Sequence, residues 1–446
     1  MKSNTNNTNQ QDVIDELRAN LDSVRENNDT KEMLPGLSKL GLAYLESGDA
    51  PKALTQFDEG LKIALEQENN EAEAQFLGLT GLAIKHIGNY SLALQKFRKS
   101  NRIARKIDHH ILICDSYIQI ALLLSENEEH TKAISQLGHA MKIASDNSDQ
   151  ARRMRIASLM ADNFHILSAF DKAVEYYVLA YEISQEIGNH LASSTFLTKV
   201  GNIFLIEKEY ESAVGQYERA LGIAEKIEDT QAAINILGGL FRAHAQQGNS
   251  RLAKIYAEQV INLAGSIEHH EAELANIHAY SSFLIDQGQL DDCIPYLEQG
   301  LETAQSQDNE SWKIAISSDL GFVFYNLDQL DQALANYHNS LDFAVQYQNQ
   351  AAEAKILGRI GAILADQGEI KTGLEKVHRG LELAHQIEDH ALVAEHQTML
   401  AFLYQDQDNA KQAIIYCKNA LATYQTLGDS EKYAMVEALL SELQDI

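Results

Sequence analysis

The stretch that decides the fold runs from Leu197 to Asp229 and reads LTKVGNIFLIEKEYESAVGQYERALGIAEKIED. Its two halves each carry apolar and small residues at intervals of three and four, which is the spacing of one face of an α-helix. A polar break at Lys208 and Glu209 separates the halves. The stretch therefore predicts a helical hairpin, with a first helix that packs against a second one.

The same hairpin recurs every 40 residues along the 446-residue chain. A small residue of the second helix keeps this spacing, with no insertion or deletion, at Ala53, Ala93, Ala133, Ala173, Ala213, Ala253, Cys293, Ala333, Gly373 and Ala413. A matching small residue of the first helix falls at Gly41, Gly81, Ala121, Ala161, Gly201, Ser281, Gly321, Gly361 and Ala401. Small side chains at both places let two helices approach closely. We therefore expect an all-α solenoid of ten hairpins, which grows by stacking and needs no separate cores.

The ends of the chain differ from the repeats. We expect the ten units to fill residues 31–429 and a helix over 12–30 to cap the first unit, with Val13, Leu17 and Leu21 as its apolar stripe. Residues 430–446 resemble the start of a further unit that is not completed, and we expect a C-terminal capping helix there. The polar residues 1–11 are expected to form a disordered tail.

Two kinds of turn punctuate each unit. Gly or Asp within the hairpins, as at Gly48, Gly248 and Asp328, suits a helix end in the left-handed conformation. Between the hairpins, residues that mostly favour helix N-caps recur at Asn69, His109, Asp149, Asn189, Asp229, His269, Asn309, Asn349, Asp389 and Asp429. We expect the first helix of the next hairpin to begin just after each of them.

Leu40-Gly41-x-x-Tyr44, Ala53, Phe57 and Gly60 resemble the tetratricopeptide (TPR) motif, and the other units match it in register. The unit of 40 residues, longer than the usual repeat of about 34, is similar to the long-helix variant of Pins/LGN-type adaptors, kinesin light chains and bacterial signalling proteins. The resemblance implies a right-handed superhelix in which the first helices line a concave groove. It also implies that a segment of a partner protein binds in that groove.

One hairpin departs from the motif. Phe241 stands where a small residue belongs, and Ala257 stands where an aromatic residue belongs. Because exchanges that conserve volume are tolerated in a core, we expect the Phe241 ring to fill the space that Ala257 leaves.

By the same resemblance, the groove positions of repeats 4 to 7 are mostly polar. The candidate partner-binding residues are Arg155, Asp162, His165, Thr198, Asn202, Asn235, Arg242, Gln246, His278 and Ser282. Asn can bond both polar groups of a peptide backbone, and Arg can grip a carboxylate with two hydrogen bonds. The alternative is that these side chains are merely solvated. Toward the ends the groove positions become apolar, as at Leu42, Leu82, Tyr325 and Phe402.

The formal net charge of −28 disfavours nucleic acid as a general partner and favours a partner segment that carries Lys or Arg. No apolar run approaches the ~20 residues of a membrane span, and the polar N-terminus lacks the apolar core of a signal peptide. The three cysteines lie far apart, which is typical of a reducing compartment. We therefore expect a cytoplasmic protein without membrane insertion.

No catalytic, cofactor or metal site is predicted. The pairs His109-His110 and His269-His270 invite a metal interpretation, but no cysteine or carboxylate set accompanies them at zinc spacing. No GxSxG, HExxH, P-loop or GxGxxG sequence occurs. The predicted function is a non-enzymatic interaction scaffold or adaptor. The main alternative is a regulator that responds to a small ligand or peptide and acts on a separate effector. An unrecognised enzyme and self-association through the apolar ends are weaker alternatives.

Overall fold

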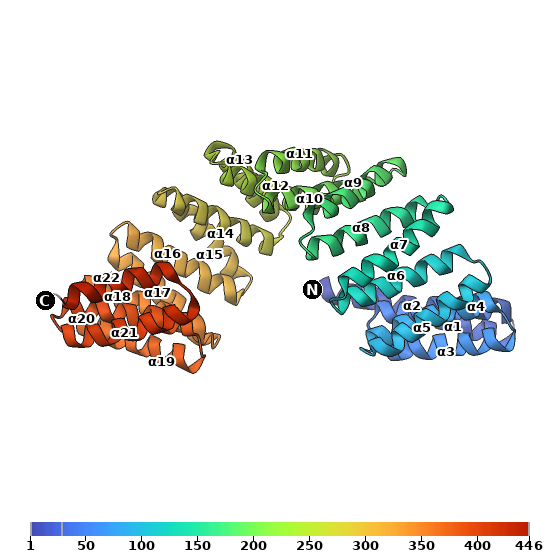
Figure 1. The fold of residues 1–446 in the computed structure, drawn as a ribbon, viewed down its shortest axis with the longest axis horizontal. Coiled ribbons are helices and arrows are strands. Elements are labelled where there is room, and N and C mark those ends of the chain that lie inside the picture. Colours follow the sequence, from blue (N-terminus) through green and yellow to red (C-terminus); the bar gives the residue numbers. More distant parts are fainter. Residues whose placement is uncertain (1, 28–29, 445–446) are drawn as a thin grey trace. The chain divides into compact units, whose positions relative to one another are not determined.

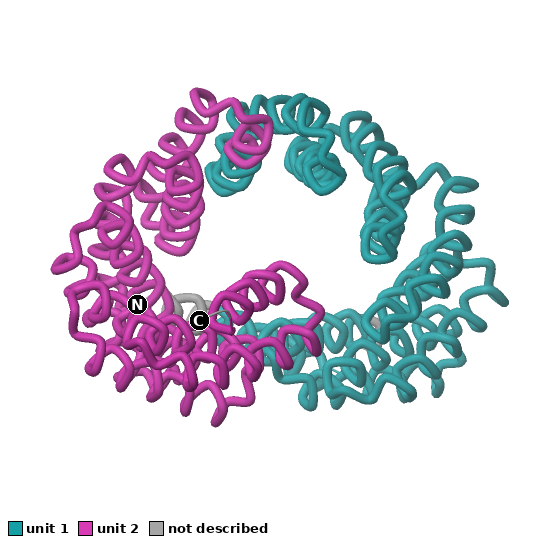
Figure 2. Tube along the Cα trace, turned by 60° about the vertical axis from the view of Figure 1, so that its left-hand side comes forward, with its two compact units in different colours: residues 1–239 teal, residues 240–446 magenta. Residues whose placement is uncertain are grey.

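The computed structural model describes residues 2–27 and 30–444, and every regular element in that part of the chain is an α-helix (Figure 1). The chain divides into two compact units, residues 1–239 and residues 240–446, which are coloured in Figure 2. Helix α12 (Thr230–Gln246) contains the boundary between them.

The helices of unit 1 are α1 (Lys2–Glu26), α2 (Thr30–Glu46), α3 (Ala50–Glu66), α4 (Asn70–His86), α5 (Tyr90–Lys106), α6 (His110–Glu126), α7 (His130–Asp146), α8 (Gln150–Ile166), α9 (Phe170–Glu186), α10 (His190–Ile206) and α11 (Tyr210–Lys226). Those of unit 2 are α13 (Ser250–Ser266), α14 (His270–Asp286), α15 (Leu290–Ser306), α16 (Glu310–Asn326), α17 (Leu330–Gln346), α18 (Gln350–Asp366), α19 (Ile370–Gln386), α20 (His390–Asp406), α21 (Ala410–Leu427) and α22 (Ser430–Gln444). Even-numbered helices from α2 to α20 are the first helices of the predicted hairpins. Those that lie wholly within one unit pack against the second helix that follows, as α4 does on α5 and α18 on α19.

The backbone repeats every 20 residues, although the sequence repeats every 40. A residue with a left-handed backbone falls at every twentieth position from Gly48 to Gly428. At the first of these turns the Gly48 N–H donates to the Leu45 carbonyl at 3.0 Å and the Asp49 N–H to the Tyr44 carbonyl at 2.8 Å, which closes the helix end. The turns between hairpins have the same geometry as the turns within them, which the residue types at Glu68 or Glu228 did not indicate.

The expected N-caps are confirmed. Asn69 accepts a hydrogen bond from the Ala72 N–H at 3.0 Å, and the residues at the other nine inter-hairpin turns accept the equivalent bond. At His109 and His269 the acceptor is the ring Nδ1 atom. These two histidines therefore begin helices α6 and α14.

Small residues set the distance between the helices of a hairpin. A Cβ atom on Gly41 would lie 2.2 Å from Cε1 of Phe57, and one on Gly201 would lie 2.8 Å from Cε1 of Tyr217. The aromatic ring of the second helix thus lies directly on the glycine of the first helix. Gly60 packs in the same way on Phe76 of the next hairpin.

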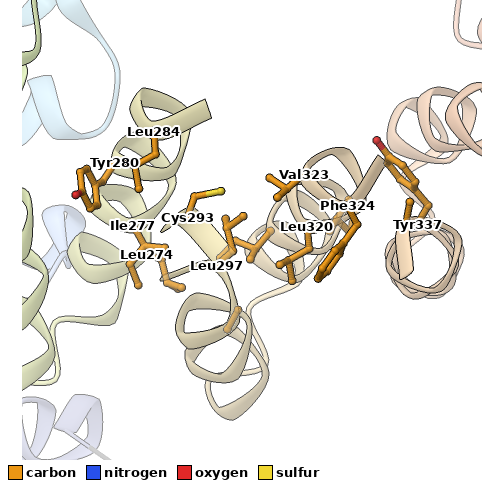
Figure 3. Close-up of a cluster of buried hydrophobic side chains, with 14 of the residues drawn as sticks. Leu274, Ile277, Tyr280, Leu284, Cys293, Leu297, Leu320, Val323, Phe324 and Tyr337 are labelled. Atoms are coloured by element: carbon orange, nitrogen blue, oxygen red, sulfur yellow. The ribbon is translucent and has the colours of Figure 1, made fainter. Parts of the chain in front are cut away.

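Within unit 2, Figure 3 shows side chains of one buried apolar cluster that come from α14, α15, α16 and α17. Cys293 and Leu297 of α15 belong to the same buried cluster as Ile277 of α14 and Leu320 of α16 (Figure 3). Cys293, like the other two cysteines, is free and buried, as expected for a small apolar filler.

The hairpin with the unusual pair keeps both of these residues in its core. Phe241 and Ala257 are both buried in one cluster of unit 2. The Phe241 ring also lies edge-on to Tyr280 and Phe283 of α14, with ring centroids 5.9 and 6.0 Å away. This hairpin therefore carries its large side chain on the first helix, whereas five other hairpins carry an aromatic residue on the second helix: Phe57, Phe97, Tyr177, Tyr217 and Tyr337.

The N-terminal helix is longer than expected. Helix α1 begins at Lys2, so residues 2–11 are helical rather than a disordered tail; neither glycine nor proline interrupts residues 2–26. Its buried stripe is Ile14 with Leu21, whereas Val13 is 47% exposed. Residue 1, residues 28–29 at the end of the expected N-terminal cap, and residues 445–446 at the end of the expected C-terminal cap lie outside the described residues.

Candidate functional site

All ten predicted site residues lie on first helices, in two groups. In unit 1, Arg155, Asp162 and His165 come from α8, Thr198 and Asn202 from α10, and Asn235 from the start of α12. In unit 2, Arg242 and Gln246 come from the end of α12, and His278 and Ser282 from α14. Successive first helices contact one another within each unit, for example α4 with α6 and α14 with α16. We call their exposed side chains the first-helix face.

Several predicted residues are open to solvent. Arg155, Asn202 and Asn235 in unit 1, and Arg242, Gln246 and Ser282 in unit 2, are exposed. The Ser282 and Thr198 hydroxyl groups donate to carbonyls of their own helices, at 2.9 and 2.8 Å. His165 lies against the Phe170 ring, with centroids 5.6 Å apart.

Asp162 and Asn202 have a structural role that the groove interpretation did not include. The Tyr217 hydroxyl donates to Oδ1 of Asn202 at 2.6 Å, and the Tyr177 hydroxyl donates to Oδ1 of Asp162 in the hairpin before. Each pair joins the first helix of a hairpin to its second helix. Where the second helix carries Phe instead, as at Phe97, the matching residue is the apolar Leu82. In these three hairpins the polarity of this position matches the tip of the ring that it meets, whereas the eighth hairpin combines Tyr337 with the apolar Phe322.

Ion pairs connect neighbouring first helices in unit 1. Lys199 of α10 reaches Asp162 of α8 at 2.5 Å. Arg152 of α8 grips Asp115 of α6 with two hydrogen bonds, of 2.8 and 3.0 Å. The bonds from Asp115 raise the pKa of the Arg152 guanidinium against the opposing effect of burial. Sequence reasoning missed Lys199 and Arg152; opposite charges 37 positions apart are the signal that would have found them.

In unit 2, His278 takes part in a comparable bridge between the first helices α14 and α16. Nδ1 of His278 lies 2.7 Å from Oδ2 of Asp319 on α16, and its ring lies edge-on to Trp312, 5.7 Å away. Nε1 of Trp312 lies 3.1 Å from both carboxylate oxygens of Glu271 on α14. The bond to Asp319 raises the pKa of His278, although burial opposes the shift. His278 is therefore held by the next hairpin.

The apolar ends of the first-helix face are partly open. Leu42 in unit 1, and Tyr325 and Phe402 in unit 2, are 38%, 37% and 40% exposed. The Tyr325 hydroxyl donates to Asp366 on α18 at 2.8 Å, which again links successive first helices.

Within residues 2–27 and 30–444, no group of three or more His, Cys, Asp or Glu side chains is placed to hold a metal ion. No helix of the described chain is long and apolar enough to cross a bilayer. Burial raises the pKa of all three cysteine thiols to about 11, so these groups are poor nucleophiles at neutral pH.

Comparison with known proteins identifies the class of the repeat. Residues 152–226, which span α8 to α11, match the family model described as tetratricopeptide repeat. Human tetratricopeptide repeat protein 29 is 26% identical over 146 residues, which cover 32% of this chain and 30% of that protein. The match thus spans less than a third of that relative's length.

Two solved structures are similar to this chain at low sequence identity. Aspartyl phosphate phosphatase F from Bacillus subtilis is 13% identical with a TM-score of 0.46, covering 78% of this chain and 93% of that one. BtubC from P. vanneervenii is 17% identical with a TM-score of 0.45, covering 49% of this chain and 92% of that one. The segment 152–226 is thus similar to tetratricopeptide repeats, and helices of the same length continue on both sides of it.

Proposed function

We propose that the chain is a non-enzymatic scaffold that binds a peptide or helical segment of a partner protein on its first-helix face. The observation that carries the proposal is the recurrence of exposed polar residues at equal 40-residue spacing. Arg155, Thr195 and Asn235 occupy one register on α8, α10 and α12 of unit 1, and all three are exposed. Polar groups that repeat at fixed distances suit the regular backbone of a bound segment.

The structure refines the choice of residues. Asp162 and Asn202 hold Tyr177 and Tyr217, and His278 is bonded to Asp319, so their contribution to binding is inseparable from packing. Arg155 and Asn235 in unit 1, and Arg242 and Gln246 in unit 2, are the exposed candidates of our set for direct contacts. Each pair belongs to one unit and can be tested without the other.

The partner segment would carry Lys or Arg opposite this face. The net charge of −28 favours a cationic segment over an anionic one through the long-range field. Because exposed ion pairs weaken with salt, capture of such a partner should fall as the ionic strength rises above about 150 mM.

The test is affinity capture from native lysate with the full chain, read by mass spectrometry. Arg155→Ala/Asn235→Ala and Arg242→Ala/Gln246→Ala are compared with Glu218→Ala/Arg251→Ala, which changes exposed residues of second helices. We expect a partner that the wild type and the control retain and that at least one first-helix variant loses. A partner that all four proteins retain equally would refute the proposal, provided that the melting temperatures agree.

A further inference from the structure

Helix α5 (Tyr90–Lys106) has a charge opposite to that of the chain. No Asp or Glu occurs between Glu73 and Asp108, whereas Lys85, Lys96, Arg98, Lys99, Arg102, Arg105 and Lys106 all lie in that interval. A stretch with seven Lys and Arg and no acid is unusual in a chain that has 64 acidic and 36 basic residues.

The other second helices are internal controls, because they share the same backbone repeat. Positions 96, 98, 99, 102, 105 and 106 of α5 all carry Lys or Arg. No other second helix has more than two such residues at the matching places, and α13 has none: Tyr256, Glu258, Gln259, Asn262, Gly265 and Ser266. The fold therefore does not require this charge.

Ion pairs with other residues of the chain neutralise little of the positive charge of α5. Lys99 reaches Glu73 at 3.1 Å. Arg98 and Arg102 are exposed and have no ion-pair partner among the described residues. Arg105 and Lys106 lie in the last turn of α5, where a positive charge is stabilised by the negative end of the helix dipole. Lys96 interacts electrostatically with the Asp58 carboxyl of α3, so Arg98 and Arg102 are the two cations left without a structural reason.

These two side chains line a groove of about 980 Å³ beside α5 in unit 1. Leu61 of α3, and Leu92 and Leu94 of α5 contribute apolar surface to the same groove, and Leu77 of α4 lies beneath it, 1% exposed. None of its lining residues is Asp or Glu. The groove thus combines an apolar surface with cations, in a part of the chain away from the proposed first-helix residues. Helix α5 is labelled among the blue N-terminal helices in Figure 1.

We propose that this groove binds an acidic amphipathic helix of a partner protein. Leucine-type side chains on one side of that helix would cover the apolar surface, and carboxylates would meet Arg98 and Arg102. Duplex nucleic acid fits less well, because its phosphate backbone would leave the leucine surface uncovered.

Fluorescence anisotropy of the 446-residue chain with a labelled helical peptide of about 20 residues tests the proposal. The peptide has Leu at helical spacing and Glu elsewhere, and two matched peptides replace Glu by Lys or Leu by Ser. Arg98→Gln/Arg102→Gln is compared with Lys172→Gln/Lys226→Gln, which removes the same charge from exposed positions of α9 and α11.

We expect saturable binding of the Glu/Leu peptide by the wild type, and weaker binding of both matched peptides. The α5 variant should bind the Glu/Leu peptide roughly fivefold more weakly, since two exposed ion pairs contribute about 0.5 kcal/mol each. The control variant, and the first-helix variant Arg155→Ala/Asn235→Ala, should bind like the wild type. The latter result also separates this surface from the proposed function.

Three results would overturn the proposal. They are no saturable binding by the wild type, equal affinity of the α5 variant and the wild type, and tighter binding of a duplex DNA of about 20 base pairs that the α5 variant loses. The last result would show that Arg98 and Arg102 bind nucleic acid.

Discussion

Thirteen residues other than glycine have a left-handed backbone at the helix ends of the described chain, among them Lys208 with φ of 63°. A residue with a Cβ pays about 1–2 kcal/mol for this conformation. Glycine avoids that strain, but its larger loss of conformational entropy on folding costs about 0.5–1 kcal/mol. The strain is the larger effect, so these positions lower the stability of the array.

Lys208→Gly should therefore raise the free energy of unfolding by about 0.5–1 kcal/mol. Gly248 lies in the turn of the next hairpin, with φ of 73°. Gly248→Ala should therefore lower the free energy of unfolding by about 0.5–1 kcal/mol. Chemical denaturation of the two variants beside the wild type measures both changes. If both substitutions shifted stability in the same direction, the strain argument would be wrong.

The bond between Tyr217 and Asn202 is the second feature at this scale. Asn202→Leu should cost about 1–2 kcal/mol, because the hydroxyl of a fully buried tyrosine loses this acceptor. Asn202→Leu/Tyr217→Phe copies the natural pair Leu82 and Phe97 and should regain most of that loss. A double-mutant cycle in urea measures the coupling. Strictly additive effects would show that the pair does not act as a unit.

At the scale of elements, glycines at helix crossings differ from glycines on open helix surfaces. A Cβ on Gly201 would overlap the Tyr217 ring, whereas one on Gly222 would meet nothing within 4 Å. Gly201→Ala should destabilise the chain, since overpacking costs about 1–3 kcal/mol and outweighs the gain of up to about 1 kcal/mol in helix propensity. Gly222→Ala should stabilise it by up to about 1 kcal/mol. Thermal unfolding distinguishes the two, and a stabilising Gly201→Ala would contradict the close crossing.

The bridge between α14 and α16 should depend on pH. Because Asp319 raises the pKa of His278, their ion pair contributes its full stability below the pKa of the unfolded chain, near 6.5. The contribution is lost as the pH rises through the higher folded value. The His278 side chain is 41% exposed, so solvent screening limits the effect to below about 1 kcal/mol.

His278→Gln should thus lower the free energy of unfolding more at pH 5.5 than at pH 8.5. Denaturant titrations at about these two values, with His338→Gln as an exposed control, measure the difference. The same loss at both pH values would exclude a protonated His278 in the bridge.

The elements were predicted well because small residues, N-caps and polar breaks are local signals. Asn69 and Gly48 identify helix ends by residue type alone. The bridges were missed because the partners of Asp162 and His278 lie on other helices, 15 to 41 positions away. The start of α1 was missed because polar residues without glycine or proline fit a helix as well as a tail.

At the scale of the whole molecule, net charge and local charge point to different partners. The value of −28 favours cationic segments, whereas Arg98 and Arg102 of α5 favour an anionic one. A scaffold with both surfaces could hold two segments of opposite charge at separate places. The described repeats provide such places because each hairpin keeps its backbone while its exposed residues vary.

The measurement that tests the central claim most directly is site-specific photo-crosslinking of the full chain in native lysate. A photoreactive amino acid at Thr195 or Asn235, both exposed on first helices, is compared with one at Glu218, exposed on the second helix α11. The scaffold account predicts that the first-helix positions crosslink one common protein and that Glu218 does not. A protein crosslinked from Glu218 and from neither first-helix position would contradict it.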